Sequence, residues 1–167
     1  MLVSVVVPVY NESDGIKLFH NDLLVPVLNA DKKNSYEIIY INDGSRDDSA
    51  QKLARIAKKD KRVKVVGFSR NFGKEIATTA GLHYATGSAA IIMDSDGQHP
   101  PARMPDFITK WQAGAQVVIG VRDSNQKEGF IKRYGSKAFY TLFNSTSGSE
   151  IVPRSTDFRL IDRVVLD

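Results

Sequence analysis

The stretch IIMDSDGQHPP, residues 91–101, sets an apolar strand directly against two carboxylates and a stiff turn. Its apolar residues end a strand predicted over 89–93. Side chains two residues apart at the end of a strand point the same way, so we expect Asp94 and Asp96 to share a face. Two carboxylates at such a short distance repel each other unless a cation lies between them. Mg²⁺ or Mn²⁺ bridging to a diphosphate would satisfy this pair, because Mg²⁺ completes its coordination with water and substrate phosphates.

The same residues also fit an interpretation without a metal. An Asp can cap the helix that is predicted to start near Pro101, and a second Asp suits a turn. Gly97 and the two prolines are typical of such a turn. The spacing of the two carboxylates leaves both interpretations open, so the other strand ends have to be considered.

Strands and helices alternate along the rest of the chain. We predict strands over residues 3–9, 36–42, 63–69, 89–93, 115–121 and 157–161. We predict helices over 13–30, 47–59, 73–85, 102–113 and 129–146, and from Asp162 onward. Pro26 should kink or split the first helix. The alternation is typical of an α/β fold with a mostly parallel sheet and helices on both faces.

Polar residues follow five of these strands. In open sheets of this kind, ligands bind at the carboxyl ends of the strands. Five polar clusters in register therefore indicate a binding site at one edge of the sheet. These clusters are Tyr10–Glu12, Asn42–Ser45, Ser69–Asn71, Asp94–Asp96 and Arg122–Asp123.

Two of the clusters favour a nucleotide. Asp43 ends a buried strand and should point into the crevice, where it can accept hydrogen bonds from a base or a ribose. Arg70 and Lys74 flank a tight turn at a helix start, which is either a phosphate site or a pair of solvated charges. Asp47 or Asp48 is expected to cap the helix that follows them. Neither GxGxxG nor GxxxxGK[ST] occurs, so dinucleotide and P-loop sites have no support.

The histidines and the tryptophan carry less information. His20 and His83 are predicted on helix surfaces, and the three histidines of the chain are not at metal-ligand spacing. His99 stands beside the carboxylate pair, so a role in the site is one possibility. Trp111 is expected in the core.

Composition and charge narrow the class of protein. A length of 167 residues suits one domain. A net charge of +4 and a pI of about 9.3 fit an acidic substrate or an anionic surface, and are too weak a bias to indicate nucleic acid. The absence of Cys excludes disulfides and thiolate metal sites.

Three features of the sequence concern contact with a membrane: its two ends and one basic segment. No apolar run approaches the roughly 20 residues that cross a bilayer, and the first residues are predicted to form a strand and not a signal peptide. The C-terminal LIDRVVLD stops inside a pattern, so we expect the chain to be part of a longer protein. Lys132, Arg133 and Lys137 flank an apolar, aromatic helix. They form either a solvated face or a site for an anionic head group beside lipid.

Six motifs in order resemble those of the family-2 glycosyltransferases of GT-A fold. The resemblance is strongest to the polyprenyl-phosphate branch, the bactoprenol glucosyltransferases and dolichyl-phosphate mannose synthases. It spans essentially the whole chain, so residues 1–167 are expected to be a GT-A catalytic domain that lacks a C-terminal membrane-anchoring part. The motifs are VVVPVYNE (5–12), INDGSRDDS (41–49), SRNFGKEIATTAGL (69–82), MDSDGQHPP (93–101), VIGVR (118–122) and DFRLIDR (157–163).

The resemblance implies roles for individual residues. Asp94 and Asp96 would bind the metal ion, with Asp96 the more direct contact to the donor diphosphate, and Gln98 would lie by the donor sugar. The nucleotide pocket would consist of Pro8, Tyr10, Glu12, Asp43, Lys74 and Asp94. The catalytic residues would be Asp157, Asp96 and Arg122. The acceptor phosphate would meet Arg133, Arg159 and Lys137. Gly97 departs from the branch, which usually has Leu there, and this leaves sugar specificity open.

The implied activity is inverting transfer of a hexose, dependent on Mg²⁺ or Mn²⁺. The donor would be a nucleotide diphosphate sugar, with UDP-glucose favoured, and the acceptor a polyprenyl phosphate. This places the protein on the cytoplasmic face of a membrane, with no nucleic acid partner and with a homo-oligomer left open. The alternatives are GDP-mannose-dependent transfer to dolichyl or polyprenyl phosphate, a soluble glycosyltransferase acting on a saccharide hydroxyl, and a non-catalytic nucleotide-sugar-binding module.

Overall fold

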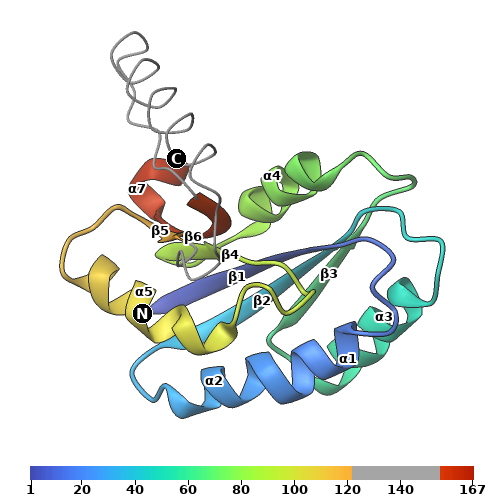
Figure 1. Ribbon diagram of the computed structural model, residues 1–167, viewed down its shortest axis with the longest axis horizontal. Helices are drawn as coiled ribbons and strands as arrows, with labels where there is room; N and C mark the ends of the chain where they lie inside the picture. The colour runs from blue at the N-terminus through green and yellow to red at the C-terminus, as the bar shows by residue number, and fades with distance from the viewer. Residues whose placement is uncertain (122–154) are drawn as a thin grey trace, which may run out of the picture. The chain divides into compact units, whose positions relative to one another are not determined.

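A single six-stranded sheet is the centre of the structure, a computed structural model that describes residues 1–121 and 155–167 (Figure 1). The strand order is β3-β2-β1-β4-β6-β5. β1 pairs in parallel with β2 and β4, β2 pairs in parallel with β3, and β6 runs antiparallel to β4. The predicted α/β fold with a mostly parallel sheet is confirmed. The strands are β1 Leu2–Val9, β2 Ser35–Asn42, β3 Val63–Gly67, β4 Ala89–Ile92, β5 Val117–Val121 and β6 Ser155–Asp162.

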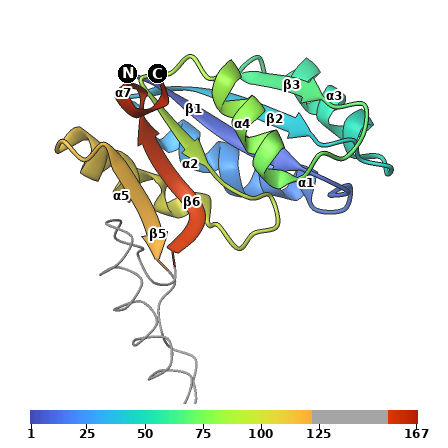
Figure 2. The ribbon, with the colours of Figure 1, turned by 90° about the horizontal axis from the view of Figure 1, so that it is seen from above.

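Helices cover both faces of this sheet, as Figures 1 and 2 show. One face carries α1 Ile16–Leu18, η1 Phe19–Leu24, α2 Val25–Ala30, α3 Ser49–Lys59, η2 Pro101–Arg103 and α5 Met104–Gln112. The other face carries α4 Lys74–Tyr84 and α7 Arg163–Leu166.

The side chains of β1 pack into two hydrophobic clusters, one on each face of the sheet. Val3, Val5, Val7 and Val9 pack into the larger cluster, under α1–α3 and α5. Val6 faces the other way and packs with Ala77 and the smaller cluster under α4. Successive side chains of a strand point to opposite faces, so a strand buried on both sides has to be apolar throughout. The unbroken valine run of β1 therefore follows from its central position in the sheet.

The first helical segment changes type beside Pro26. The π-helical turn η1 ends where α2 begins, and Pro26 lies in the first turn of α2. Proline has no N–H to donate and fits best in the first turn of an α-helix. The predicted split at Pro26 is therefore present as a switch from π to α geometry.

His20 corrects one sequence-based prediction. It was expected on a helix surface, but it is buried, with Nδ1 3.0 Å from the Tyr40 hydroxyl and Nε2 3.6 Å from Asp60. The hydroxyl of a buried tyrosine needs a hydrogen-bond partner, and the histidine supplies it. His83 is exposed and Trp111 is buried in the larger cluster, as predicted.

Two compact units divide the chain. Residues Met1–Ile119 and Asp157–Asp167 form the first and contain both hydrophobic clusters, while Gly120–Thr156 form the second. The helix predicted over 129–146 lies outside the described residues. Among the residues that are described, none of the helices is long and apolar enough to cross a membrane.

Candidate active site

A cavity of about 520 Å³ opens at the carboxyl ends of the parallel strands. Residues from four of the predicted polar clusters meet in this cavity. The fifth cluster, Arg122–Asp123, lies outside the described residues. The lining consists of Pro8, Val9, Tyr10, Glu12, Asp43, Asn71, Gly73, Lys74, Asp94, Ser95 and Asp96.

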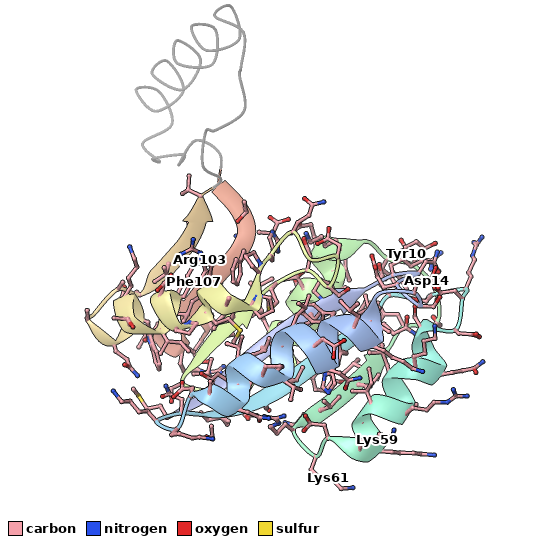
Figure 3. The ribbon with its side chains drawn as sticks, turned by 60° about the horizontal axis from the view of Figure 1, so that its bottom comes forward. Tyr10, Asp14, Lys59, Lys61, Arg103 and Phe107 are labelled. Atoms are coloured by element: carbon pink, nitrogen blue, oxygen red, sulfur yellow. The ribbon has the colours of Figure 1, made fainter. Side chains whose placement is uncertain are left out.

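The loop after β1 is held against the N-terminus of α3. The Glu12 backbone N–H donates to Ser49 Oγ at 2.9 Å, and the Ser13 N–H donates to Asp47 at 3.0 Å. Asp47 also accepts from the Ser49 N–H, so it is Asp47 that serves the first turn of the helix, while Asp48 makes no side-chain cap. Figure 3 shows Tyr10 and Asp14 at the same end of the molecule on this loop.

The pKa of Glu12 reflects the negative charge of the site. Burial raises its pKa above the ordinary value, and the nearby charges of Asp96, Asp47 and Asp94 raise it further. The cavity therefore has an excess of negative charge around Glu12, although Lys74 also lines it. A bound cation would relieve this repulsion.

Asp43 is buried at the end of β2 and fixes the neighbouring loop. Its two carboxylate oxygens accept hydrogen bonds from the N–H groups of Phe72 (2.7 Å) and Gly73 (2.9 Å). Gly73 precedes α4 with a φ of 97°, a conformation that only glycine adopts readily. Asp43 thereby sets the start of α4, and Lys74 is the first residue of that helix.

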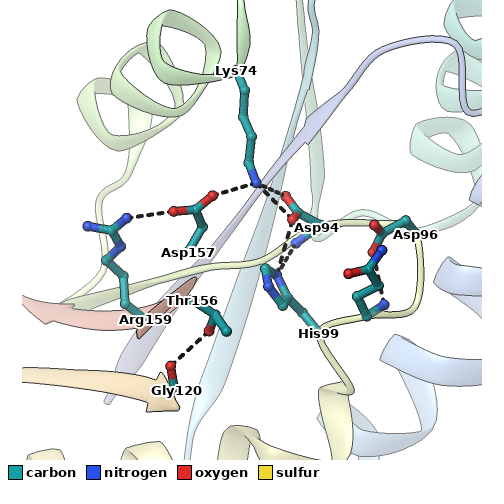
Figure 4. A network of polar contacts seen from close by, with 9 residues as sticks. Lys74, Asp94, Asp96, His99, Gly120, Thr156, Asp157 and Arg159 are labelled. Carbon is teal, nitrogen blue, oxygen red and sulfur yellow. Dashed lines mark hydrogen bonds and ion pairs between the residues drawn. The ribbon is translucent and has the colours of Figure 1, made fainter. Parts of the chain in front are cut away.

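Lys74 joins two carboxylates from distant parts of the sequence (Figure 4). Its Nζ lies 2.8 Å from oxygens of both Asp94 and Asp157. Burial alone would lower the pKa of Lys74, but the hydrogen bonds to Asp157 and Asp94 raise it above the ordinary value. The hydrogen bond from Lys74 likewise lowers the pKa of Asp157. The Lys74 ammonium and the Asp157 carboxylate are therefore charged at neutral pH.

The direction of β6 explains how Asp157 reaches this lysine. Ile92 pairs with Arg159 in the antiparallel β4–β6 ladder. Continuing that register by two residues sets Asp94 opposite Asp157. Arg159 donates to Asp157 at 3.1 Å, and its Nε is a buried donor without a partner in the described part of the chain.

Asp96 has a different environment from Asp94. It is exposed, and its carboxylate accepts the N–H of Gln98 at 2.9 Å. Gly97 between them has a φ of 82°. A glycine suits this turn, because L side chains rarely adopt that backbone conformation. Asp94 and Asp96 both line the cavity as predicted, but only Asp94 contacts Lys74.

The sequence left the role of His99 undecided, and the structure makes it a hydrogen-bond partner of Asp94. It is buried, and its Nδ1 accepts the backbone N–H of Asp94 at 3.0 Å. Its ring stacks on Phe158, the residue after Asp157, with centroids 5.4 Å apart and 18° between the planes. A histidine three residues after the second Asp of the pair was the available signal, but the stacking partner was not visible in the sequence.

The donor groups fit a divalent cation that is shared with a ligand. Within residues 1–121 and 155–167, no three His, Cys, Asp or Glu side chains group as a protein-only metal site. Mg²⁺ is usually held by one or two carboxylates together with substrate phosphates, so Asp94 and Asp96 are a sufficient protein contribution. The negative charge around Glu12 agrees with this.

The remaining predicted residues cannot be placed. Arg122, Arg133 and Lys137 lie outside the described residues. Of the predicted acceptor-phosphate residues, Arg159 alone is in the described part, next to Asp157.

Comparison with known proteins agrees with this geometry. The sequence profile of glycosyl transferase family 2 matches residues 4–167. The chain belongs to this family. It is 39% identical over 99% of its length to glycosyltransferase sll0501 of Synechocystis sp., of which it covers 51%. It is 41% identical over its full length to the prophage bactoprenol glucosyl transferase homolog of Escherichia coli K12, covering 54% of that protein. The chain thus spans about half the length of these relatives.

Solved structures share the fold. Glucosyl-3-phosphoglycerate synthase from Mycobacterium tuberculosis, in complex with Mn²⁺, UDP and phosphoglyceric acid, matches with a TM-score of 0.68 at 20% identity, over 98% of this chain and 56% of that one. The mannosyltransferase PcManGT from Pyrobaculum calidifontis, in complex with GDP-Man and Mn²⁺, matches with a TM-score of 0.66 at 21% identity, over 98% and 45%. The chain therefore has the GT-A fold.

Proposed function

We propose that the protein transfers a hexose from a nucleotide diphosphate sugar to a polyprenyl phosphate. The observation that carries the proposal is the cavity lined by Asp94, Asp96 and Lys74, in which Lys74 is hydrogen-bonded to both Asp94 and Asp157. This set offers carboxylates for a divalent cation and an ammonium for phosphate oxygens at one sheet edge. The bactoprenol glucosyl transferases among its relatives support the lipid phosphate as acceptor.

The donor we favour is UDP-glucose. The names of the bactoprenol relatives point to glucose, and a fold neighbour binds UDP together with Mn²⁺. The nucleotide would lie against Pro8, Tyr10 and Glu12, with Asp43 beside the base or ribose. Gln98, in the turn after Asp96, would contact the donor sugar.

The reaction would be a single displacement with inversion at the anomeric carbon. An acceptor oxygen forms the new bond to that carbon, and the bond to the donor diphosphate breaks as negative charge develops on the leaving oxygen. Mg²⁺ or Mn²⁺ held by Asp94 and Asp96 would supply Lewis-acid stabilisation of that charge. Lys74 lies beside Asp94 and would add its positive charge to the leaving diphosphate.

Asp157 would orient groups and would not need to remove a proton. A phosphate monoester has a second pKa of about 6, so a lipid phosphate is already a nucleophilic anion at neutral pH. Asp157 is held ionised between Lys74 and Arg159. Arg159 would meet the acceptor phosphate through the donor that has no partner among the described residues. We assign Arg122, Arg133 and Lys137 to the phosphates by resemblance alone.

The location follows from the proposed acceptor. A polyprenyl phosphate is embedded in a bilayer, so the enzyme would work at the cytoplasmic face of a membrane. The basic residues around 132–137 would contact anionic head groups there.

Thermal unfolding with nucleotides tests the donor half of the proposal. Wild type and an Asp94→Asn/Asp96→Asn variant are each measured with UDP or GDP, with and without Mn²⁺. A ligand at 100 times its Kd adds about 2.7 kcal/mol to stability. We expect a Mn²⁺-dependent rise of Tm with UDP in the wild type only. A rise with GDP instead would favour the mannosyl alternative, and no rise with either nucleotide would contradict the proposed site.

The acceptor half needs a transfer assay. UDP-[¹⁴C]glucose is incubated with undecaprenyl phosphate in detergent or with a soluble oligosaccharide, and labelled product is extracted into organic solvent or retained in water. Label in the lipid supports the proposal. Label in the oligosaccharide alone would favour a saccharide acceptor, and binding without any transfer would favour a binding module.

A further inference from the structure

His99 is buried between Asp94, at the end of β4, and the strand β6, and it does not line the cavity. On one side its Nδ1 accepts the backbone N–H of Asp94 at 3.0 Å. On the other side its ring stacks on Phe158, the residue after Asp157. One buried imidazole therefore contacts the β4 end of the site and the β6 strand together.

The hydrogen bond defines the state of the imidazole ring. Nδ1 can accept the Asp94 N–H only when Nδ1 carries no proton, so the neutral ring carries its proton on Nε2. The Asp94 N–H lies two residues beyond Ile92, the last residue of β4, and His99 supplies the acceptor that the sheet no longer offers.

The stack extends into the core. Phe158 also packs on Phe107 of α5, with ring centroids 4.5 Å apart. Phe107 and Phe158 both belong to the larger hydrophobic cluster. The position of His99 is therefore set by packed rings on β6 and α5, which are rigid elements and not loops.

We propose that His99 is a positioning residue that fixes the backbone of Asp94 relative to Asp157. The inference rests on the proposed function for its consequence, since Asp94 is there a ligand of the metal–diphosphate unit. Groups that orient metal ligands typically contribute 10- to 100-fold to metal affinity or activity. His99 would act in this way through the Asp94 main chain, without touching the substrate.

Two substitutions separate the hydrogen bond from the stack. In His99→Asn, the side-chain oxygen can occupy the place of Nδ1, which keeps the acceptor and loses the stacked ring. In His99→Phe, the ring is kept on Phe158 and the acceptor is lost. Phe158→Leu retains the histidine and removes its stacking partner, and serves as the matched control for the stack.

Amide hydrogen exchange measures the positioning directly. We expect the Asp94 amide to be protected in the wild type and in His99→Asn, and to exchange at least about tenfold faster in His99→Phe, because a hydrogen bond of about 1.4 kcal/mol corresponds to that factor. Equal exchange of this amide in the wild type and His99→Phe would overturn the proposal. This readout does not depend on any ligand.

Nucleotide affinity then tests the consequence. The Kd for UDP in the presence of Mn²⁺ should rise by about tenfold or more in His99→Phe and remain near the wild-type value in His99→Asn. The Tm should be higher in His99→Phe than in His99→Asn, since His99→Asn loses the packed ring. If affinity instead follows Tm across the variants, His99 is only a core residue. If the wild type shows no Mn²⁺-dependent binding, the proposed function fails, and the exchange rates still decide the role of His99.

Discussion

Lys74 and Asp157 stand 83 positions apart in the sequence and are joined by a hydrogen bond of 2.8 Å. The same ammonium lies 2.8 Å from Asp94, so one cation separates two carboxylates that would otherwise repel each other. A divalent cation arriving at Asp94 with a diphosphate would take over this neutralisation. Lys74 would then be free to bind phosphate oxygens. The lysine is thus positioned to stabilise the site both before and after the donor binds.

Replacing Lys74 by methionine should therefore weaken nucleotide diphosphate binding and transfer together. The variant keeps most of the length of the side chain but leaves Asp94 and Asp157 without their shared cation. We expect a loss of about 10- to 100-fold in transfer, of the size of other lost electrostatic contacts to developing charge. Isothermal titration with UDP and Mn²⁺, followed by a radiolabel transfer assay, measures both steps.

Lys74→Arg provides the matched control. It keeps the charge but spreads it over a planar group, so binding should be retained better than transfer. Unchanged binding and transfer in Lys74→Met would show that the lysine only fills space between the carboxylates.

Asp157→Asn distinguishes an orienting carboxylate from a general base. With a phosphate acceptor no proton has to be removed, so the rate of transfer should fall only mildly while donor binding is retained. The rate should also stay flat between about pH 7 and 9, above the second pKa of the acceptor, at about 6. Single-turnover transfer at several pH values checks this. Near-total loss of transfer with intact binding would point to base catalysis and to a hydroxyl acceptor.

Sequence patterns predicted the sheet, its helices and the meeting of the polar strand ends, because each depends on periodicity and on the general geometry of parallel sheets. The bond between Lys74 and Asp157 could not be predicted, since it requires β6 to run antiparallel beside β4, and no pattern in DFRLI gives a direction. The buried position of His20 depends on the hydroxyl of Tyr40, a contact between elements. Gly97 was noted as a departure from the family, and the structure gives it a φ of 82°, a conformation that favours glycine.

Glu37 should make the stability of the fold sensitive to acid. Burial raises its pKa, but hydrogen bonds from Lys64, Ser4 and Thr86 more than offset this, leaving a pKa of about 2. Because the folded pKa lies below the unfolded value, the contribution is complete above the ordinary pKa of 4.5 and is lost as pH falls toward 2. The shift corresponds to about 3 kcal/mol. Urea unfolding between pH 7 and pH 3 measures the slope.

Glu37→Gln should lower the free energy of unfolding at pH 7 and flatten its fall below pH 4.5. The exposed Glu75→Gln serves as the control and should leave the slope close to wild type. A slope that is equally steep in Glu37→Gln would assign the acid sensitivity to other carboxylates.

Gly81 lets α4 pack close to the sheet, so Gly81→Ala should destabilise the protein. Gly→Ala inside a helix ordinarily stabilises by about 0.5–1 kcal/mol. Here the added Cβ would lie 2.3 Å from Val6 Cγ1 and 3.1 Å from Ile41 Cγ1, so the helix has to move away from β1 and β2. We expect a net loss of about 1–3 kcal/mol in urea unfolding. UDP affinity should fall as well, since Lys74 begins the displaced helix.

Two further variants test whether close packing is the cause. Gly67→Ala adds a Cβ with no atom within 4 Å and should change stability by no more than about 0.5 kcal/mol. Val6→Ala removes the methyl group that clashes, so combining it with Gly81→Ala should cost less than the sum of the two single changes. Additive losses in the double variant would mean that the helix does not rest on Val6 as closely as the structure places it. Recovered UDP affinity in the double variant would in turn tie the depth of α4 on the sheet to the position of Lys74.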